Sequence, residues 1–98
     1  MALRDDAALL ILTSLAGGPK HGYAMVEDIA AITGVRLGPG TLYGAIGRLE
    51  AEGMIEALES DDRRRPYQIT QRGRSHLETE IGSMKGLIAT GLRRLKRA

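Results

Sequence analysis

The sequence predicts a mainly α fold with a small β-hairpin, arranged as a winged helix-turn-helix with a C-terminal dimerisation helix. Three observations favour this fold class. Glycine and proline residues divide the first half of the chain into three segments with helical apolar periodicity. Two short alternating segments follow, separated by a charged stretch, and a long amphipathic segment ends the chain.

The three predicted helices of the first half begin and end at recognisable residues. The first, residues 3–16, is apolar on almost every side, which is typical of a helix covered by more than one neighbour. The second begins near His21 and ends at Gly34, a residue suited to the C-cap position. The third begins at Pro39, because proline fits the first turn of a helix, and ends at Gly53.

A hairpin and a last helix are predicted in the second half of the chain. Residues 54–59 and 67–70 alternate weakly between apolar and polar side chains, as strands do. The polar stretch 60–66 between them is the expected hairpin tip. Thr70 suits the N-cap of a final helix that runs to about Lys96.

Length and composition limit the classes of function. The 98 residues are expected to form one compact unit, with a DNA-binding domain at residues 1–70 and a dimerisation helix at residues 71–98. The absence of cysteine excludes disulfides and thiolate metal sites, and is compatible with a cytoplasmic protein. No signal peptide or membrane segment is recognised, and a net charge of +2 permits nucleic-acid binding.

The outward face of the third helix is rich in glycine. Apolar residues at positions 42, 45, 46 and 49 are expected to face inward. The residues expected to face outward are Gly40, Thr41, Tyr43, Gly44, Gly47 and Arg48. Glycine in a helix costs roughly 1 kcal/mol relative to alanine, and close approach of the backbone to DNA is a functional reason for it. The alternative is that glycines fall on this face by chance, because the chain contains 13 of them.

Three arginines, Arg63, Arg64 and Arg65, lie at the predicted hairpin tip. There, guanidinium groups can reach phosphates or a minor groove beside the site of the third helix. The alternative is a solvated run of charge, because Glu59, Asp61 and Asp62 adjoin the arginines and neutralise part of their charge.

The last segment carries a narrow apolar seam of the coiled-coil type. Its members follow one another at steps of four, three, four, four and three residues: Leu77, Ile81, Met84, Ile88, Leu92 and Leu95. The seam predicts a two-fold homodimer in which this helix and the first helix pack against the partner, unless the stripe packs on its own domain. Such a dimer suits half-sites about 34 Å apart in a pseudo-palindromic operator.

Three segments of the chain, HGYAMVEDI, GPGTLYGAIGRLEAEGMIEA and RRRPYQITQRGR, are specific enough to indicate a family. They resemble the HGY, PGTLY, RLEEEGLI and YxLTxxGR segments of the PadR family of bacterial transcriptional regulators. The resemblance covers residues 7 to about 76. It implies a winged helix-turn-helix domain with a C-terminal dimerisation helix, usually in a repressor that responds to a small molecule or to stress.

The resemblance also implies roles for individual residues. By matching positions, Arg63 to Arg65 fall in the family's wing, and its recognition helix includes Gly40, Thr41, Tyr43 and Arg48. Two positions depart from the family, because Gly44 stands where proline is frequent and Gly47 where a basic or histidine side chain is common. These departures leave fewer side chains for base readout, so specificity would rest on Arg48, Thr41 and DNA shape.

The leading interpretation is a sequence-specific regulator, most simply a repressor, that binds double-stranded DNA as a homodimer. The alternative is a winged-helix protein-interaction module without DNA binding. An enzyme is not expected, because the chain has no set of nucleophile, base and orienting residue and no phosphate-binding glycine loop. We expect no cofactor and no metal site, since His21 suits a helix cap and His76 is far from it in sequence.

The aromatic residues are three tyrosines, without tryptophan or phenylalanine. Tyr43 is expected to contact a phosphate, whereas Tyr23 and Tyr67 are expected to be buried with hydrogen-bonded hydroxyl groups. Some relatives hold flat hydrophobic compounds between aromatic side chains at the dimer interface, but the last helix contains none. An unidentified small-molecule effector is therefore left open as a partner, with one candidate place among Met84, Leu87 and Ile88.

Overall fold

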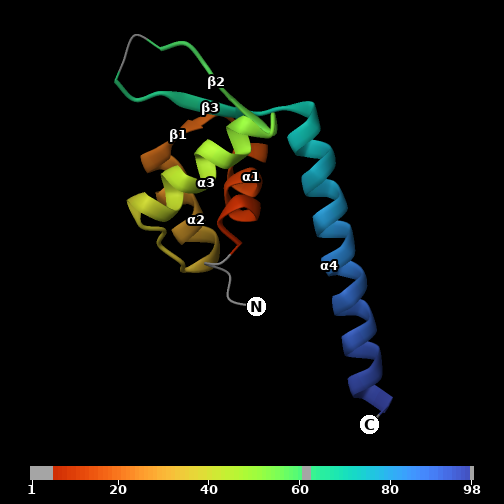
Figure 1. Cartoon of the computed structure of the whole chain (residues 1–98). Coiled ribbons are helices and arrows are strands. Elements are labelled where there is room, and N and C mark those ends of the chain that lie inside the picture. Colours follow the sequence, from red (N-terminus) through yellow and green to blue (C-terminus); the bar gives the residue numbers. More distant parts are fainter. Residues whose placement is uncertain (1–5, 61–62, 98) are drawn as a thin grey trace.

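The computed structural model describes residues 6–60 and 63–97. In this part of the chain the helices are α1 (Ala7–Ala16), α2 (Gly22–Thr33), α3 (Pro39–Ala51) and α4 (Gln71–Arg97), and the strands are β1 (Lys20–His21), β2 (Ile55–Ala57) and β3 (Pro66–Ile69). Figure 1 shows helices α1 to α3 gathered beneath the strands, with α4 extending away from them. The predicted fold class, a winged helix-turn-helix with a long C-terminal helix, is confirmed. The expected start of the first helix, residues 3–5, lies outside the described residues.

Helix α1 lies at the centre of the core. Its residues Ile11, Leu12 and Leu15 are at most 1% exposed, because α2, α3, β3 and the start of α4 all pack around the helix. The almost uniformly apolar surface of α1 is therefore covered largely within one chain.

Local capping explains where α2 and α3 begin and end. The Ala24 backbone N–H donates to His21 Nδ1 at 3.3 Å, so His21 is a helix cap, as predicted. Gly34 ends α2 with a φ of 77°, a left-handed conformation that glycine adopts without steric cost. Its N–H donates to the Ala30 carbonyl oxygen at 2.8 Å. Pro39 occupies the first turn of α3, where its missing N–H leaves no helical hydrogen bond unmade.

The sheet contains one strand more than the predicted hairpin. Its order is β1-β3-β2, and both pairs are antiparallel. The described part of the wing consists of β2, β3 and the connecting residues 58–60 and 63–65, with Ile55 opposite Ile69. In β1, Lys20 pairs with Tyr67. A strand of two residues is too short to show the alternation by which a sequence predicts a strand.

The junction between the wing and α4 is tightly packed. Thr70 donates its backbone N–H to the Met54 carbonyl oxygen at 3.0 Å and its hydroxyl to the Gly53 carbonyl oxygen at 2.7 Å. Its hydroxyl oxygen also accepts the Gly73 N–H at 3.1 Å, as expected for an N-cap. A Cβ at Gly73 would overlap the Met54 carbonyl oxygen. Only glycine fits this contact without displacing the backbone, so the direction of α4 is set here.

Beyond its first turns, α4 leaves the core. Of its described residues, only Gly73 and Leu77 are buried. The helix gives the molecule an extent of 58 Å in one direction against 26 and 20 Å in the others (Figure 1). None of the described helices is both long enough and apolar enough to cross a membrane.

Candidate nucleic-acid interface

Helix α3 presents a bare strip of backbone to the surface. Its apolar face is packed in the core through Leu42, Ala45, Ile46 and Leu49, each at most 3% exposed. On the opposite face, a Cβ added at Gly40 or Gly47 would meet no atom within 4 Å. At Gly44 it would meet only Arg48 Nη1, at 3.9 Å. No packing constraint therefore explains these three glycines, which we call the glycine strip.

Side chains flank the glycine strip on both sides. Tyr43 is 57% exposed on the side that faces the wing. Thr41 and Arg48 are exposed on the other side, where Arg48 lines a groove of about 410 Å³ between α1 and α4. The structure thus places Arg48 away from the arginines of the wing.

A basic pocket lies between the start of α2, α3 and the wing. Its volume is about 330 Å³, and its lining residues are His21, Gly22, Tyr23, Tyr43, Arg63, Arg64, Arg65 and Tyr67. Tyr43 and the three arginines, proposed independently from the sequence, therefore lie around one hollow. Of the proposed neutralising residues, Glu59 is exposed, and Asp61 and Asp62 lie outside the described residues.

Gly22 determines where the Tyr43 side chain can lie. A Cβ at position 22 would be 2.8 Å from the Tyr43 hydroxyl oxygen and 3.2 Å from the ring carbon that bears it. The tyrosine ring thus rests against the backbone at the start of α2. Sequence reasoning missed Gly22, because a glycine inside an apolar helical pattern gives no sign of what packs on it.

Tyr23 is not buried as expected, because its side chain is 64% exposed. In α2 the residues facing the core are Met25, Val26 and Ile29, and Tyr23 is out of register with them. The sequence pattern groups Tyr23 with the apolar residues of this segment, and only the packing of α2 turns its side chain outward.

Tyr67 lies half-buried on β3, where it lines the basic pocket. Burial raises the pKa of its hydroxyl above the usual value, and the negative charge of Glu50 adds to this effect, whereas Arg65 opposes it. The phenol is therefore neutral near pH 7 and able to donate a hydrogen bond.

The predicted seam of α4 divides into a buried and an exposed part. Leu77 is 6% exposed and belongs to the core of its own chain, which corrects its assignment to a dimer interface. Met84 is half-buried and, with Leu87, lines the groove between α1 and α4, whereas Ile88 is not among its lining residues. The exposed members of the seam are Ile81 at 46%, Ile88 at 60%, Leu92 at 58% and Leu95 at 75%.

Comparison with known proteins agrees with this architecture. Residues 11–79 match the family described as Transcriptional regulator PadR-like family. A 37.1 kDa protein of transposon Tn4556 from Streptomyces fradiae is 49% identical over 83 residues, which cover 85% of this chain but only 24% of that protein. The transcriptional regulator Rv3488 of Mycobacterium tuberculosis is 35% identical over 87 residues, covering 86% of this chain and 80% of the regulator.

A solved structure shows the same fold along nearly the whole chain. It is a transcriptional regulator from Clostridium thermocellum, with a TM-score of 0.80 and 26% sequence identity. The superposition covers 94% of this chain and 91% of that protein. The long C-terminal helix is therefore part of the shared architecture.

Proposed function

Because the chain belongs to the PadR-like family of transcriptional regulators, we propose that it is a homodimeric repressor that binds a pseudo-palindromic operator. It is a DNA-binding regulator with a winged helix. In our proposal α3 lies in the major groove and the wing contacts the flanking backbone, as in other proteins of this architecture.

The observation that carries the proposal is the basic pocket beside the exposed face of α3. Arg63, Arg64 and Arg65 are exposed there, next to the ring of Tyr43. Guanidinium groups bind phosphate through several hydrogen bonds, and a tyrosine hydroxyl adds another. A phosphate backbone that follows α3 toward the wing would meet all four side chains.

The glycine strip supports a particular way of approaching DNA. Gly40, Gly44 and Gly47 have open space before them, so α3 can come closer to the groove than a helix that carries side chains there. This face offers few hydrogen bonds to base edges. In our proposal specificity comes from Thr41 and Arg48 at its edge and from the shape of the DNA.

The exposed part of the seam supports the homodimer. Ile81, Ile88 and Leu92 recur on one face of α4 without a cover from their own chain. Packing this face of α4 against a second copy around a two-fold axis would remove it from water, whereas α1, which the sequence also assigned to the dimer interface, is largely covered by its own chain. The axis would also place two α3 helices on half-sites about 34 Å apart.

We further propose that repression ends when the angle between the two winged-helix domains of the dimer, which we call the heads, changes. The contact of Gly73 with Met54 and the hydrogen bonds of Thr70 join each head firmly to α4. A shift between the paired α4 helices would then move both heads and change the spacing of the α3 helices.

The test is a binding titration with the DNA immediately upstream of the protein's own gene. Unrelated DNA of equal length is the control, and both are measured across a salt series. We expect saturable binding of one dimer to the upstream fragment, with affinity that falls steeply with salt. Equal binding of both fragments would contradict an operator near the gene, and no binding to either would favour a protein-interaction module.

A further inference from the structure

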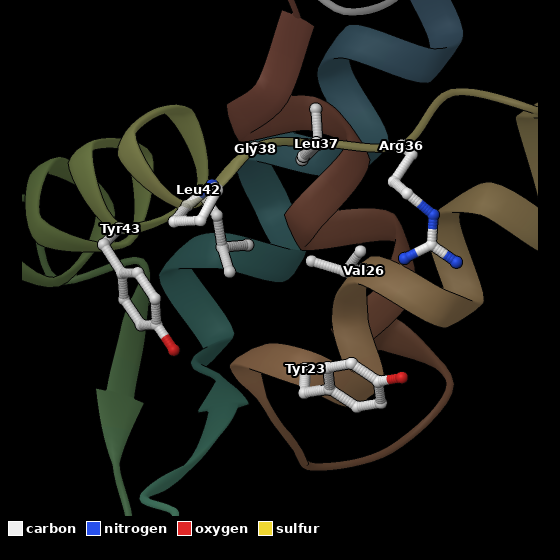
Figure 2. A pocket seen from close by; sticks show the side chains of 8 residues that line it. Tyr23, Val26, Arg36, Leu37, Gly38, Leu42 and Tyr43 are labelled. Atoms are coloured by element: carbon white, nitrogen blue, oxygen red, sulfur yellow. The ribbon is translucent and has the colours of Figure 1, made fainter.

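A second pocket lies beside the basic pocket, between α2 and the turn that leads into α3. Its volume is about 530 Å³, within the range of roughly 300–1,000 Å³ that is usual for small-molecule sites. Figure 2 shows its side chains arranged around one central space, with Tyr43 and Arg36 on opposite sides of it. We call it the turn pocket.

The floor of the turn pocket is apolar and belongs to the core. Val26, Leu37 and Leu42 are 8%, 5% and 3% exposed, and all three line the pocket. These side chains are held in place by the packing behind them. The floor is therefore a preformed apolar surface that needs no rearrangement to receive a ligand.

The rim of the turn pocket carries two of the chain's three aromatic rings. Tyr23 comes from α2 and Tyr43 from α3, and their side chains are 64% and 57% exposed. Aromatic rings recognise flat ligands by stacking or by edge-to-face contact. Because the chain has no tryptophan and no phenylalanine, its aromatic surface is concentrated on this side of the molecule.

One edge of the turn pocket carries the guanidinium group of Arg36, paired with the carboxylate of Glu27. Arg36 Nη2 donates to Glu27 Oε1 at 2.9 Å, and the Arg36 side chain is 59% exposed. A guanidinium group has five N–H donors, so the bond to Glu27 orients the group and leaves other donors for a ligand. An anionic group at the edge of a bound ring would meet these donors.

We propose that the turn pocket is an effector site for a planar, mostly apolar molecule that carries one anionic group. The ring system lies on the floor of Val26, Leu37 and Leu42, between Tyr23 and Tyr43. The anionic group lies at the pocket edge and accepts hydrogen bonds from Arg36.

The regulatory consequence rests on the proposed DNA-binding function. Tyr23 and Tyr43 line both the turn pocket and the basic pocket. Gly22 leaves the Tyr43 ring little room to retreat, since its hydroxyl already lies against that backbone. A ligand in the turn pocket therefore engages the ring that would meet a phosphate, and ligand and DNA weaken each other's binding by the same factor.

The experiment uses the full-length protein and two fluorescent probes that differ in charge. The anionic probe is 8-anilinonaphthalene-1-sulfonate, and the neutral one is N-phenyl-1-naphthylamine, which lacks the sulfonate. We expect Tyr23→Ala to weaken the binding of both probes by about tenfold. Arg36→Gln should weaken the anionic probe several-fold and leave the neutral probe unchanged, because it removes the guanidinium donors and leaves the Glu27 carboxylate, which repels an anion, without its partner.

The matched control is Leu87→Ala, which alters the exposed apolar surface of α4 and should leave both probes bound. Loss of binding in Leu87→Ala but not in Tyr23→Ala would overturn the site. An Arg36→Gln variant that binds the anionic probe as tightly as the parent does would contradict the proposal that Arg36 binds an anionic group of the ligand. Circular dichroism of each variant verifies the fold, which these exposed positions should not disturb.

Competition with DNA is measured separately. A duplex bound by the protein should displace the anionic probe, and a duplex that binds without displacing it would overturn the regulatory inference. Titration of the duplex without probe tests the proposed function alone. A protein that binds the probe at Tyr23 and Arg36 but binds no duplex would support the site and contradict the DNA-binding proposal.

Discussion

Helices α3 and α4 both leave one face exposed, but the two faces are of opposite kinds. The apolar face of α3 is covered by its own chain, and what remains outside is the glycine strip between Tyr43 and Arg48. After Leu77, α4 instead exposes its apolar side. The apolar face of α3 is thus fully buried within one chain, and its outer face is free to meet a polar ligand. Helix α4 instead has an apolar face that a second chain would cover.

The largest effect is expected when a charge is placed on the exposed seam of α4. Ile88→Asp should raise the dissociation constant of the dimer by about 100-fold or more, because an unpaired carboxylate would be buried at the interface. DNA affinity should fall with it. Analytical ultracentrifugation and fluorescence anisotropy measure the two quantities. Thr90→Asp, on the other side of the helix, is the control, and tight operator binding by a monomeric Ile88→Asp protein would contradict the dimer.

The next effect concerns the junction that joins the two regions. Gly73→Ala should lower the free energy of unfolding by about 1–3 kcal/mol, because the new methyl group overlaps the Met54 carbonyl and the backbone must move. Urea denaturation measures the change. Gly82→Ala is the matched control, since its Cβ meets nothing within 4 Å, and it should raise stability by up to about 1 kcal/mol. Equal stability of the two variants would refute the tight junction.

A smaller effect distinguishes the arginines of the wing from those of α4. Arg64→Ala should weaken DNA binding and reduce the slope of log affinity against log salt by about one unit per lost phosphate contact in each subunit. Arg94→Ala, in the last turn of α4, removes the same charge and should leave the slope nearly unchanged. An equal loss of slope in both variants would mean that the net charge of the protein, and not a contact between the wing and DNA, determines the salt dependence of binding.

The smallest effect tests the glycine strip. Gly47→Ala should raise the free energy of unfolding by up to about 1 kcal/mol, because alanine is the better helix former and its methyl group has open space. DNA affinity should fall a few-fold, because the methyl group holds α3 away from the groove. Gly86→Ala in α4 should give the same stability gain with no change in affinity. A Gly47→Ala protein that binds DNA as well as the parent would contradict the proposal that the glycine strip lets α3 approach the DNA closely.

Prediction from the sequence was most successful where structure depends on local signals. Gly34 and Pro39 mark the end of α2 and the start of α3, as predicted, because a left-handed φ and a missing N–H are properties of single residues. Prediction was less successful where the structure depends on packing against other segments of the chain. β1 was missed because a strand of two residues shows no alternation. Tyr23 was wrongly placed inside because it shares helical spacing with apolar residues, while the packing of α2 turns it outward.

The candidate site was predicted in pieces that only the fold joins. Tyr43 and the three arginines were each proposed from the sequence, yet their common pocket depends on how α3, the wing and the start of α2 come together. The turn pocket has no sequence signal, since its floor residues look like ordinary core residues.

The sequence by itself determined the positions of the helices, the glycine strip and the run of arginines in the wing, because each follows from residue type and spacing along one segment. The tertiary structure decided which of these features meet. The contacts of Gly22 with Tyr43 and of Gly73 with Met54 join residues about 20 positions apart, and burial of Leu77 depends on the surface that α1 offers to α4. Such contacts depend on the packing of separate segments around one core, which local spacing does not encode.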